Sequence, residues 1–481
     1  MLIISTYNQN SSLAVREKAA GELVFLEKDD NAAIKRLTEE ARKYNESESK
    51  RLECYLILSD QTSLWLLQTV GLPQEIEDKV DVFATTMEDL LAKTIFVKLP
   101  NLPSKFPPLD RQPIAYGSDT TVHLVIVGFS AQTEALALNA ALVAHYPNYC
   151  KDTRLRTRIT IIDENVYDGR DRLIQRYAHL FDNSYYRTID LNDTHPQCLV
   201  HRPMYEKEHR KDFVDVEWEF VNGNIRNDAV RQKLEEWSTD NRHLLTIAVC
   251  HTDNNRNYSE SFGLPQQVYN QEIPVLCHTE ESELIQIATK EGTYTSVYPF
   301  GSECCDINTL RTLKRLAQRV NYVYNHCFSL VSGDPITAPA SIDEDKLEMQ
   351  WRQIGSLSKQ YSNIFNAMTL GTKMHSIGHT SEDWEAYYAV TLEEINILTE
   401  VEHNRWSVEE LILGYRPVTE KEEKLVENDI SQKKALRQKK IHYDLRAFSD
   451  LRTDSTGKNV NVYDMALIQG IPLIIKSCIT D

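Results

Sequence analysis

Short apolar runs alternate with polar, helix-like stretches along the first hundred residues. Near-continuous apolar strands separated by helices are typical of a parallel sheet covered by helices. We therefore expect a Rossmann-like module over residues 1–100, followed by a proline-rich linker over residues 101–120, because proline neither donates to a ladder nor extends a helix. The predicted strands are Leu2–Thr6, Leu23–Asp29, Cys54–Asp60, Val80–Thr86 and Thr94–Leu99.

The same alternation restarts at Val122 and predicts a second, longer Rossmann-like module over residues 121–330. A helix over Asp306–Cys327 carries leucine and valine on one stripe and is expected to close this module by packing on its sheet. The predicted strands are Val122–Phe129, Arg158–Asn165, His243–Cys250, Ile273–Thr279 and Ser296–Gly301.

From about residue 331 the helical pattern continues without strands. We expect a helical connector over residues 331–390 and a separate, mostly helical domain over residues 391–481. The predicted fold class is therefore α/β, with tandem Rossmann-like parallel-sheet modules followed by an α-helical domain.

Charge and composition exclude several classes of function. The chain of 481 residues has 71 acidic and 53 basic residues, a formal net charge of -18, so general binding to nucleic acid is not expected. No segment has the roughly 18 to 20 uninterrupted apolar residues that cross a bilayer. The nine cysteines form no CxxC pair, so neither a disulfide framework nor a metal site is indicated. We expect a cytoplasmic protein.

The stretch "VIVGFSAQTEALAL" from Val125 to Leu138 has the layout of a strand, a nucleotide-binding turn and a helix. A dinucleotide turn uses three glycines, for the tight turn, for the approach of the pyrophosphate and for helix packing. Only the first is present, as Gly128, while Ser130 and Thr133 stand at the other two positions. The helix N-terminus still offers free N–H groups, so an anion in a shifted position remains possible here.

Asp163 stands at the end of the next predicted strand, where an acidic residue would bind a ribose hydroxyl. A strand-end turn or a helix cap explains Asp163 equally well. The insertion before this strand supplies a basic cluster, including Arg158, which we expect beside the same sheet edge. The predicted nucleotide contacts are thus Gly128, Ser130, Thr133, Asp163 and Arg158, with NAD or another adenine nucleotide as the cofactor.

No convergent catalytic group is evident. His251 and His278 lie at the carboxyl edge of the predicted sheet and could act as general acids. Their sequence neighbourhoods indicate no partner, so ordinary polar loop residues are the simpler interpretation. We assign no catalytic residue.

The segment "VEHNRWSVEELILGYRP" from Val401 to Pro417 is the densest signal in the helical domain. On a helix Arg405 can pair with Glu402 or Glu409, while Trp406 supplies a large apolar anchor. A basic run over Lys433–Lys440 follows, for which a solvated helix face and an anion site are both open interpretations.

The order of these motifs, with "HYDLRAFSDL" and "YDMALIQGIPLII" after them, resembles the RyR domain, the repeat named after ryanodine receptors and also found in bacterial proteins. The similarity covers about Thr391 to Ser477. The middle module similarly resembles a TrkA-N or RCK-type Rossmann domain, although its glycine pattern departs from that family. The residues that carry the first resemblance are Glu402, His403, Arg405, Trp406, Gly414, Tyr415, His442, Leu445, Phe448, Tyr463 and Leu467.

These resemblances imply a bacterial, non-enzymatic sensor that binds a nucleotide or a nucleotide-derived ligand and acts in ion transport or in a defence system. They also imply a homodimer and a membrane channel partner or a fused membrane segment. An NAD(P)-dependent oxidoreductase and a protein-docking scaffold are the alternatives. In the RyR-like domain aromatic planes would contact a base and cations would contact phosphates, and the predicted ligand-binding residues are Glu402, His403, Arg405, Trp406, Tyr415, Arg416 and Lys439.

Overall fold

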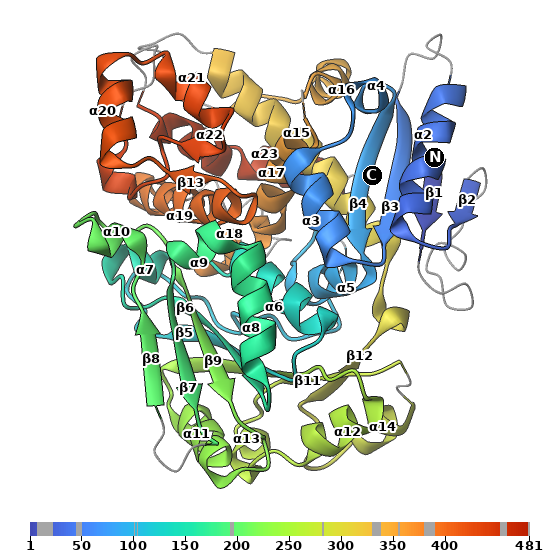
Figure 1. Ribbon diagram of the computed structural model, residues 1–481, viewed down its shortest axis with the longest axis vertical. Coiled ribbons are helices and arrows are strands. Elements are labelled where there is room, and N and C mark those ends of the chain that lie inside the picture. The colour runs from blue at the N-terminus through green and yellow to red at the C-terminus, as the bar shows by residue number, and fades with distance from the viewer. Residues whose placement is uncertain are drawn as a thin grey trace.

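The computed structural model describes residues 1–6, 23–44, 51–100, 102, 104–192, 197–280, 283–329, 338–354, 356–379, 390–452 and 459–479. The fold is α/β, with two parallel-rich sheets and a helical C-terminal region, as predicted. In Figure 1 the N-terminal sheet and the helical C-terminal region lie next to each other, and the larger sheet lies below both.

The N-terminal sheet has the strand order β2-β1-β3-β4, and all of its pairs are parallel. Its strands are β1 (Leu2–Ser5), β2 (Leu23–Leu26), β3 (Leu52–Leu58) and β4 (Val80–Thr86). Its helices are α2 (Asp30–Lys43), α3 (Gln61–Val70), α4 (Gln74–Glu77) and α5 (Met87–Phe96).

The predicted strand over Thr94–Leu99 is wrong, because α5 continues to Phe96. The Thr86 side chain accepts a hydrogen bond from the Asp89 N–H and so caps this helix directly after β4. The apolar run is the buried end of that helix, since Ile95 and Phe96 are almost fully buried.

The larger sheet has the order β12-β11-β10-β5-β6-β9-β7-β8, in which only β8 is antiparallel. From β12 to β9 this is the doubly wound order of a Rossmann fold, with the switch point between β5 and β10. The pair β7 and β8 is an insertion that extends the sheet beyond β9. The strands are β5 (Thr121–Val127), β6 (Thr157–Asp163), β7 (Tyr185–Asp190), β8 (Gln197–His201), β9 (Val216–Asn222), β10 (His243–Val249), β11 (Val275–His278) and β12 (Val297–Phe300).

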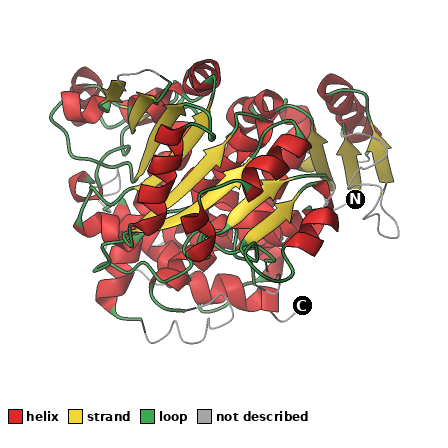
Figure 2. Ribbon diagram, turned by 90° about the horizontal axis from the view of Figure 1, so that it is seen from below, coloured by secondary structure: helices red, strands yellow, loops and turns green. Residues whose placement is uncertain are grey.

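Helices lie on both faces of this sheet, as the view in Figure 2 shows. One face packs against the rest of the molecule, and the other has its own apolar cluster, which includes Val125, Leu234 and Val268. The helices are α6 (Ala131–Val143), α7 (Pro147–Lys151), α8 (Val166–Arg176), α9 (Ala178–Asp182), α10 (Met204–Lys207), α11 (Asp228–Thr239), α12 (Asn254–Phe262), α13 (Gln266–Asn270) and α14 (Glu283–Ala288), with a short 3-10 helix at Ser302–Cys304.

Helix α15 (Ile307–Ser329) corrects a second prediction. Its apolar stripe is buried, but it packs mainly against α16 (Glu344–Arg352), α17 (Leu357–Met368), α22 (Asn461–Gln469) and α23 (Ile471–Ile479), whereas we expected it to close the larger sheet. Its Lys314 also reaches Glu53 and Asp81 on the N-terminal sheet. The helix therefore joins the N-terminal sheet, the connector and the C-terminal region.

The C-terminal region is built around α19 (Leu392–Ile412), which packs on α22 and also contacts α6, α7 and α9 of the larger sheet unit. The connector contributes α18 (Leu370–Ser376) beside it. The remaining elements are β13 (Arg416–Pro417), α20 (Glu420–Asn428), α21 (Gln432–Arg437), β14 (Ile441–His442) and a 3-10 turn at Phe448–Asp450.

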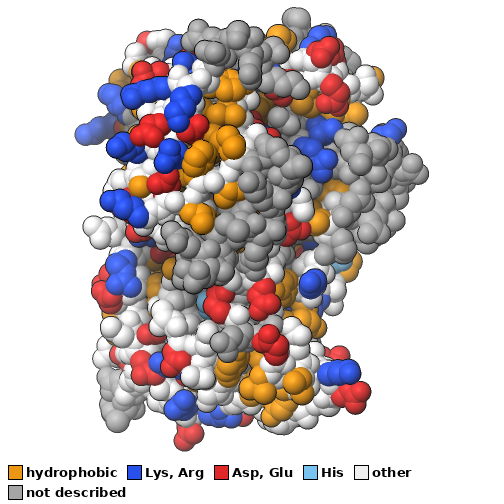
Figure 3. All heavy atoms as spheres, turned by 90° about the vertical axis from the view of Figure 1, so that its right-hand side faces the viewer, with side chains coloured by type: hydrophobic (Ala, Val, Ile, Leu, Met, Phe, Trp, Pro, Cys, Tyr) orange, Lys and Arg blue, Asp and Glu red, His pale blue; other side chains and the backbone are white. Residues whose placement is uncertain are grey.

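One apolar cluster extends from Leu2 on β1 to Ile475 on α23, so the three regions share a core. In the described part of the chain no helix is long and apolar enough to cross a membrane. Figure 3 shows acidic and basic side chains in both the upper and the lower part of one face. Side chains of both charges are therefore intermixed on that face.

Candidate functional site

The structure brings Gly128, Ser130, Thr133 and Asp163 together at the carboxyl edge of β5 and β6. Gly128 has a φ of +93°. A Cβ atom there would lie 2.6 Å from Nδ1 of His251, whose ring follows β10 across the switch point. Both the positive φ and the imidazole contact explain the glycine, independently of any phosphate.

The side chains of Ser130 and Thr133 satisfy two of the N–H groups at this helix N-terminus, namely each other's. Ser130 and Thr133 form a capping box on α6, and Thr133 Oγ1 also donates to the Gly128 carbonyl over 2.9 Å. Gln132 donates to the Glu88 carbonyl of α5, so the N-terminal module covers the start of α6. A phosphate here would have to displace these contacts.

Asp163 accepts hydrogen bonds from the backbone N–H of Phe129 at 3.0 Å and of Asn165 at 2.8 Å. Asp163 therefore holds the loops after β5 and β6 close to each other. This role agrees with the interpretation of Asp163 as a strand-end turn residue. Arg158 lies near the amino end of β6, five residues from Asp163, or about 17 Å along the strand, and pairs with Glu217 over 2.6 Å. The expectation that Arg158 lies at the same edge as Gly128 is wrong, because the insertion precedes the strand.

Two of the residues predicted to bind a ligand in the C-terminal region, Glu402 and Arg405, form part of a buried ion network. Arg405 donates to both carboxylate oxygens of Glu402, at 2.8 and 2.9 Å, and also contacts Glu409. Lys373 from α18 lies 2.5 Å from Glu402. We call Lys373, Glu402, Arg405 and Glu409 the buried ion network; its side chains are at most 2% exposed.

Opposite pKa shifts occur inside this network. Burial would raise the pKa of Glu402, but Arg405 and Lys373 hold it at about 2. Burial raises the pKa of Glu409 to about 8 even though Arg405 opposes the shift. Glu402 is therefore the charged partner of the two cations, whereas Glu409 holds a proton at neutral pH.

His403, Trp406 and Tyr415 form an aromatic cluster around His442. The Trp406 ring lies 4.8 Å from the His442 ring, and Tyr415 lies 6.0 Å from it. His403 Nε2 donates to the Arg446 carbonyl over 2.8 Å. The cluster thus fixes the backbone that carries Arg446, while Lys439, also predicted to bind a ligand, is exposed.

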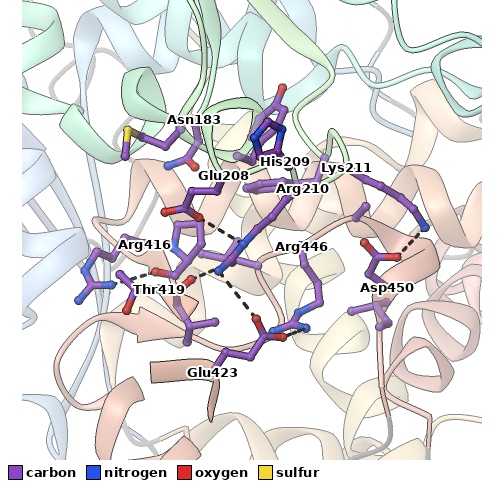
Figure 4. Close-up of a pocket in the computed structure, with 18 of the residues that line it drawn as sticks. Asn183, Glu208, His209, Arg210, Lys211, Arg416, Thr419, Glu423, Arg446 and Asp450 are labelled. Atoms are coloured by element: carbon purple, nitrogen blue, oxygen red, sulfur yellow. Dashed lines mark hydrogen bonds and ion pairs between the residues drawn. The ribbon is translucent and has the colours of Figure 1, made fainter. Parts of the chain in front are cut away.

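Next to this cluster lies a cleft of about 720 Å³ between the larger sheet unit and the C-terminal region. We call it the interdomain cleft. One wall is formed by α9, α10 and the loop after α10, and the other by β13, α20 and the segment from Leu445 to Arg452 (Figure 4). Arg416 is the one predicted site residue that lines it. Its other cationic side chains are Arg210, Lys211, Arg446 and Arg452.

The two walls are joined by polar contacts from the loop after α10. Arg210 Nη1 donates to the Val418 carbonyl over 2.8 Å, and Lys211 lies 2.6 Å from the Asp450 carboxylate. His209, directly before Arg210, has a φ of +57°, a conformation uncommon for a residue other than glycine. Figure 4 shows the Arg210 side chain directed across the cleft toward Glu423.

Guanidinium groups remain available in the interdomain cleft. Nη2 of Arg446 and Nη2 of Arg210 are buried and have no hydrogen-bond partner among the residues that the structure describes. Arg446 lies over the Tyr443 ring at 4.3 Å, which holds its side chain in place. Preorganised guanidinium groups of this kind match the oxygens of phosphate and carboxylate ligands.

The sequence analysis missed Arg210, Lys211 and Arg446 as site residues. The first two lie in the basic stretch "KEHRK" over Lys207–Lys211, a local cluster of charge that is visible in the sequence. Arg446 lies inside the "HYDLRAFSDL" motif, which entered the prediction only as part of a resemblance to the RyR domain.

No family model, curated protein or solved structure matches this chain. Within the described ranges no group of three or more His, Cys, Asp or Glu residues is placed to hold a metal ion.

Proposed function

We propose that this protein is a non-enzymatic sensor that binds a nucleotide or a nucleotide-derived ligand in the interdomain cleft. The observation that carries the proposal is the set of arginines that enter one cleft from two structural units, with the Nη2 atoms of Arg210 and Arg446 lacking hydrogen-bond partners among described residues. The volume of about 720 Å³ is within the range of small-molecule sites.

The location supports a sensing role. A ligand that contacts both walls binds more tightly when the walls are close together than when they are apart. Its binding therefore shifts the equilibrium toward the closed arrangement, by the difference between its two affinities. The proposed resemblance to RyR and TrkA-N proteins agrees with a sensor, and NAD or another adenine nucleotide is the ligand class that we propose. The turn at Gly128 is the weaker candidate site, because Ser130 and Thr133 already cap its helix and Gln132 already contacts the N-terminal module.

A thermal-shift screen of the full chain against ATP, NAD, ADP-ribose and cyclic nucleotides tests this function. A ligand at 100 times its dissociation constant adds about 2.7 kcal/mol of stability. We expect at least one of these compounds to raise the melting temperature, and the increase to be lost in Arg446→Gln and reduced in Arg416→Gln. Arg154→Gln is the control, because Arg154 is an exposed arginine that pairs locally with Asp152.

The result that contradicts this location is a shift that survives both cleft substitutions and is lost in Ser130→Arg, which would assign binding to the turn after β5. No shift with any compound would contradict the sensor and favour the scaffold.

A further inference from the structure

Glu423 on α20 has an unusual position in the interdomain cleft. Its carboxylate lies 2.9 Å from Arg446 Nη1 and 3.4 Å from Arg452 Nη2, with Arg210 Nη2 from the opposite wall at 3.8 Å. Three guanidinium groups from two structural units thus converge on one carboxylate that lines the cleft, and Figure 4 shows two of them, Arg210 and Arg446, directed toward it.

This carboxylate does not satisfy the three arginines. One of its oxygens faces both Arg446 and Arg452, while the other is beyond hydrogen-bond distance from Arg210. Arg452 also pairs with Glu427 and Arg210 with Glu208, so each is shared with a second carboxylate. A phosphoryl group has three oxygens and more negative charge, and so matches converging guanidinium groups better than a single carboxylate does.

We propose that Glu423 is a built-in competitor for the ligand, and that a terminal phosphoryl group of the ligand displaces its carboxylate from Arg446, Arg452 and Arg210. This inference rests on the proposed function and names the part of the ligand that the cleft recognises. No covalent step is involved, since one anion replaces another on the same three cations.

The exchange also gives the cleft a means of regulation. Arg210 belongs to the loop after α10, whereas Glu423 belongs to α20, so their attraction acts between the two walls. When a phosphoryl group takes the place of Glu423, Arg210 pairs with the ligand and no longer with α20. The position of α20 then depends on whether the cleft is occupied.

Calorimetric titration of the full chain with pyrophosphate and with ADP tests the proposal. Glu423→Gln keeps the shape of the side chain and removes its charge. We expect it to bind both probes at least about tenfold more tightly than the unmodified protein, equivalent to about 1.4 kcal/mol. Glu420→Gln is the matched control, with the same charge change on the same helix at a position that does not line the cleft, and its affinity should change by less than about twofold.

Glu423→Asp provides a second measurement if the glutamine variant does not fold, because it shortens the side chain by one methylene and should tighten binding by a smaller factor. Unchanged or weaker binding in the Glu423 variants overturns the competitor proposal. If the unmodified protein still binds ADP in a manner that Arg446→Gln abolishes, the proposed function stands without it. If neither the unmodified protein nor the Glu423 variants bind either probe, both proposals fail.

Discussion

The molecule contains two clusters in which arginine meets glutamate, one within its helical part and one between the larger sheet unit and the C-terminal region, and they differ in burial. In the buried ion network the Arg405 side chain is 2% exposed and both carboxylate oxygens of Glu402 are paired with it. In the interdomain cleft the Arg446 and Arg210 side chains are 10% and 21% exposed, and their Nη2 atoms lack a hydrogen-bond partner among the described residues. The same side chains thus stabilise the fold in one place and remain available for a ligand in the other.

This difference shows that charge in a sequence motif does not by itself identify a ligand site. A buried cation is acceptable only when neighbouring carboxylates compensate it, and then it has little capacity left for a ligand. The Arg446 and Arg210 side chains of the cleft are partly exposed, and each has one nitrogen that no described residue engages in a hydrogen bond. The predictions below test this contrast, from the largest expected effect to the smallest.

Replacing Arg405 by Met should destabilise the fold by about 3–5 kcal/mol, because it leaves buried Glu402 with only one of its two cations. The matched change Arg452→Met, at a cation 49% exposed, should cost less than about 1 kcal/mol. Urea unfolding followed by circular dichroism measures both. Nearly equal losses would show that the two clusters are not energetically different.

The pH dependence of stability should distinguish Glu409 from the carboxylates of the cleft. Burial raises its pKa from 4.5 to about 8, so the folded state holds a proton between these values that the unfolded state has released. Stability should therefore fall as the pH rises from about 5 to 8, by an amount on the order of 3 to 4 kcal/mol. Glu409→Gln should remove this decrease, whereas Glu423→Gln should leave it in place. A decrease that persists unchanged in Glu409→Gln would refute this assignment.

Replacing Gly128 by Ala should destabilise the protein by about 1–3 kcal/mol, because its φ is +93° and the new Cβ would meet the His251 ring. The cost should be smaller when His251→Ala is already present, which a double-mutant cycle measures. If Gly128→Ala instead leaves stability unchanged but abolishes nucleotide binding, the turn after β5 is the ligand site.

The apolar pattern predicted most of the two parallel sheets, and β4 has the predicted bounds Val80–Thr86. The apolar pattern gave a wrong prediction at Thr94–Leu99, because a short buried run is typical both of a strand and of the core face of a helix. Here the segment is helical, since Thr86 caps a helix that begins directly after β4. Strand β9 (Val216–Asn222) was missed because the charged side chains of Glu217 and Glu219 interrupt its apolar run, although Arg158 and Arg187 pair with them.

The candidate site was less predictable than the fold. Arg405 and Arg446 lie in motifs that are similarly rich in charged and aromatic residues. Only the packing of α17, α18 and α19 determines which of the two arginines is buried. Arg210 and Glu423 are more than two hundred residues apart, so their contact depends on how the two units pack. Local sequence contains no information of that kind.

Hydrogen–deuterium exchange of the full chain, with and without the nucleotide that gives the largest thermal shift, tests the central claim most directly because it locates the ligand. We predict slower exchange on both walls of the interdomain cleft, in residues 204–213 and in residues 416–423 and 445–452, with no change in residues 128–133. Slower exchange confined to residues 128–133 and 163–165, with the cleft unaffected, would contradict the claim.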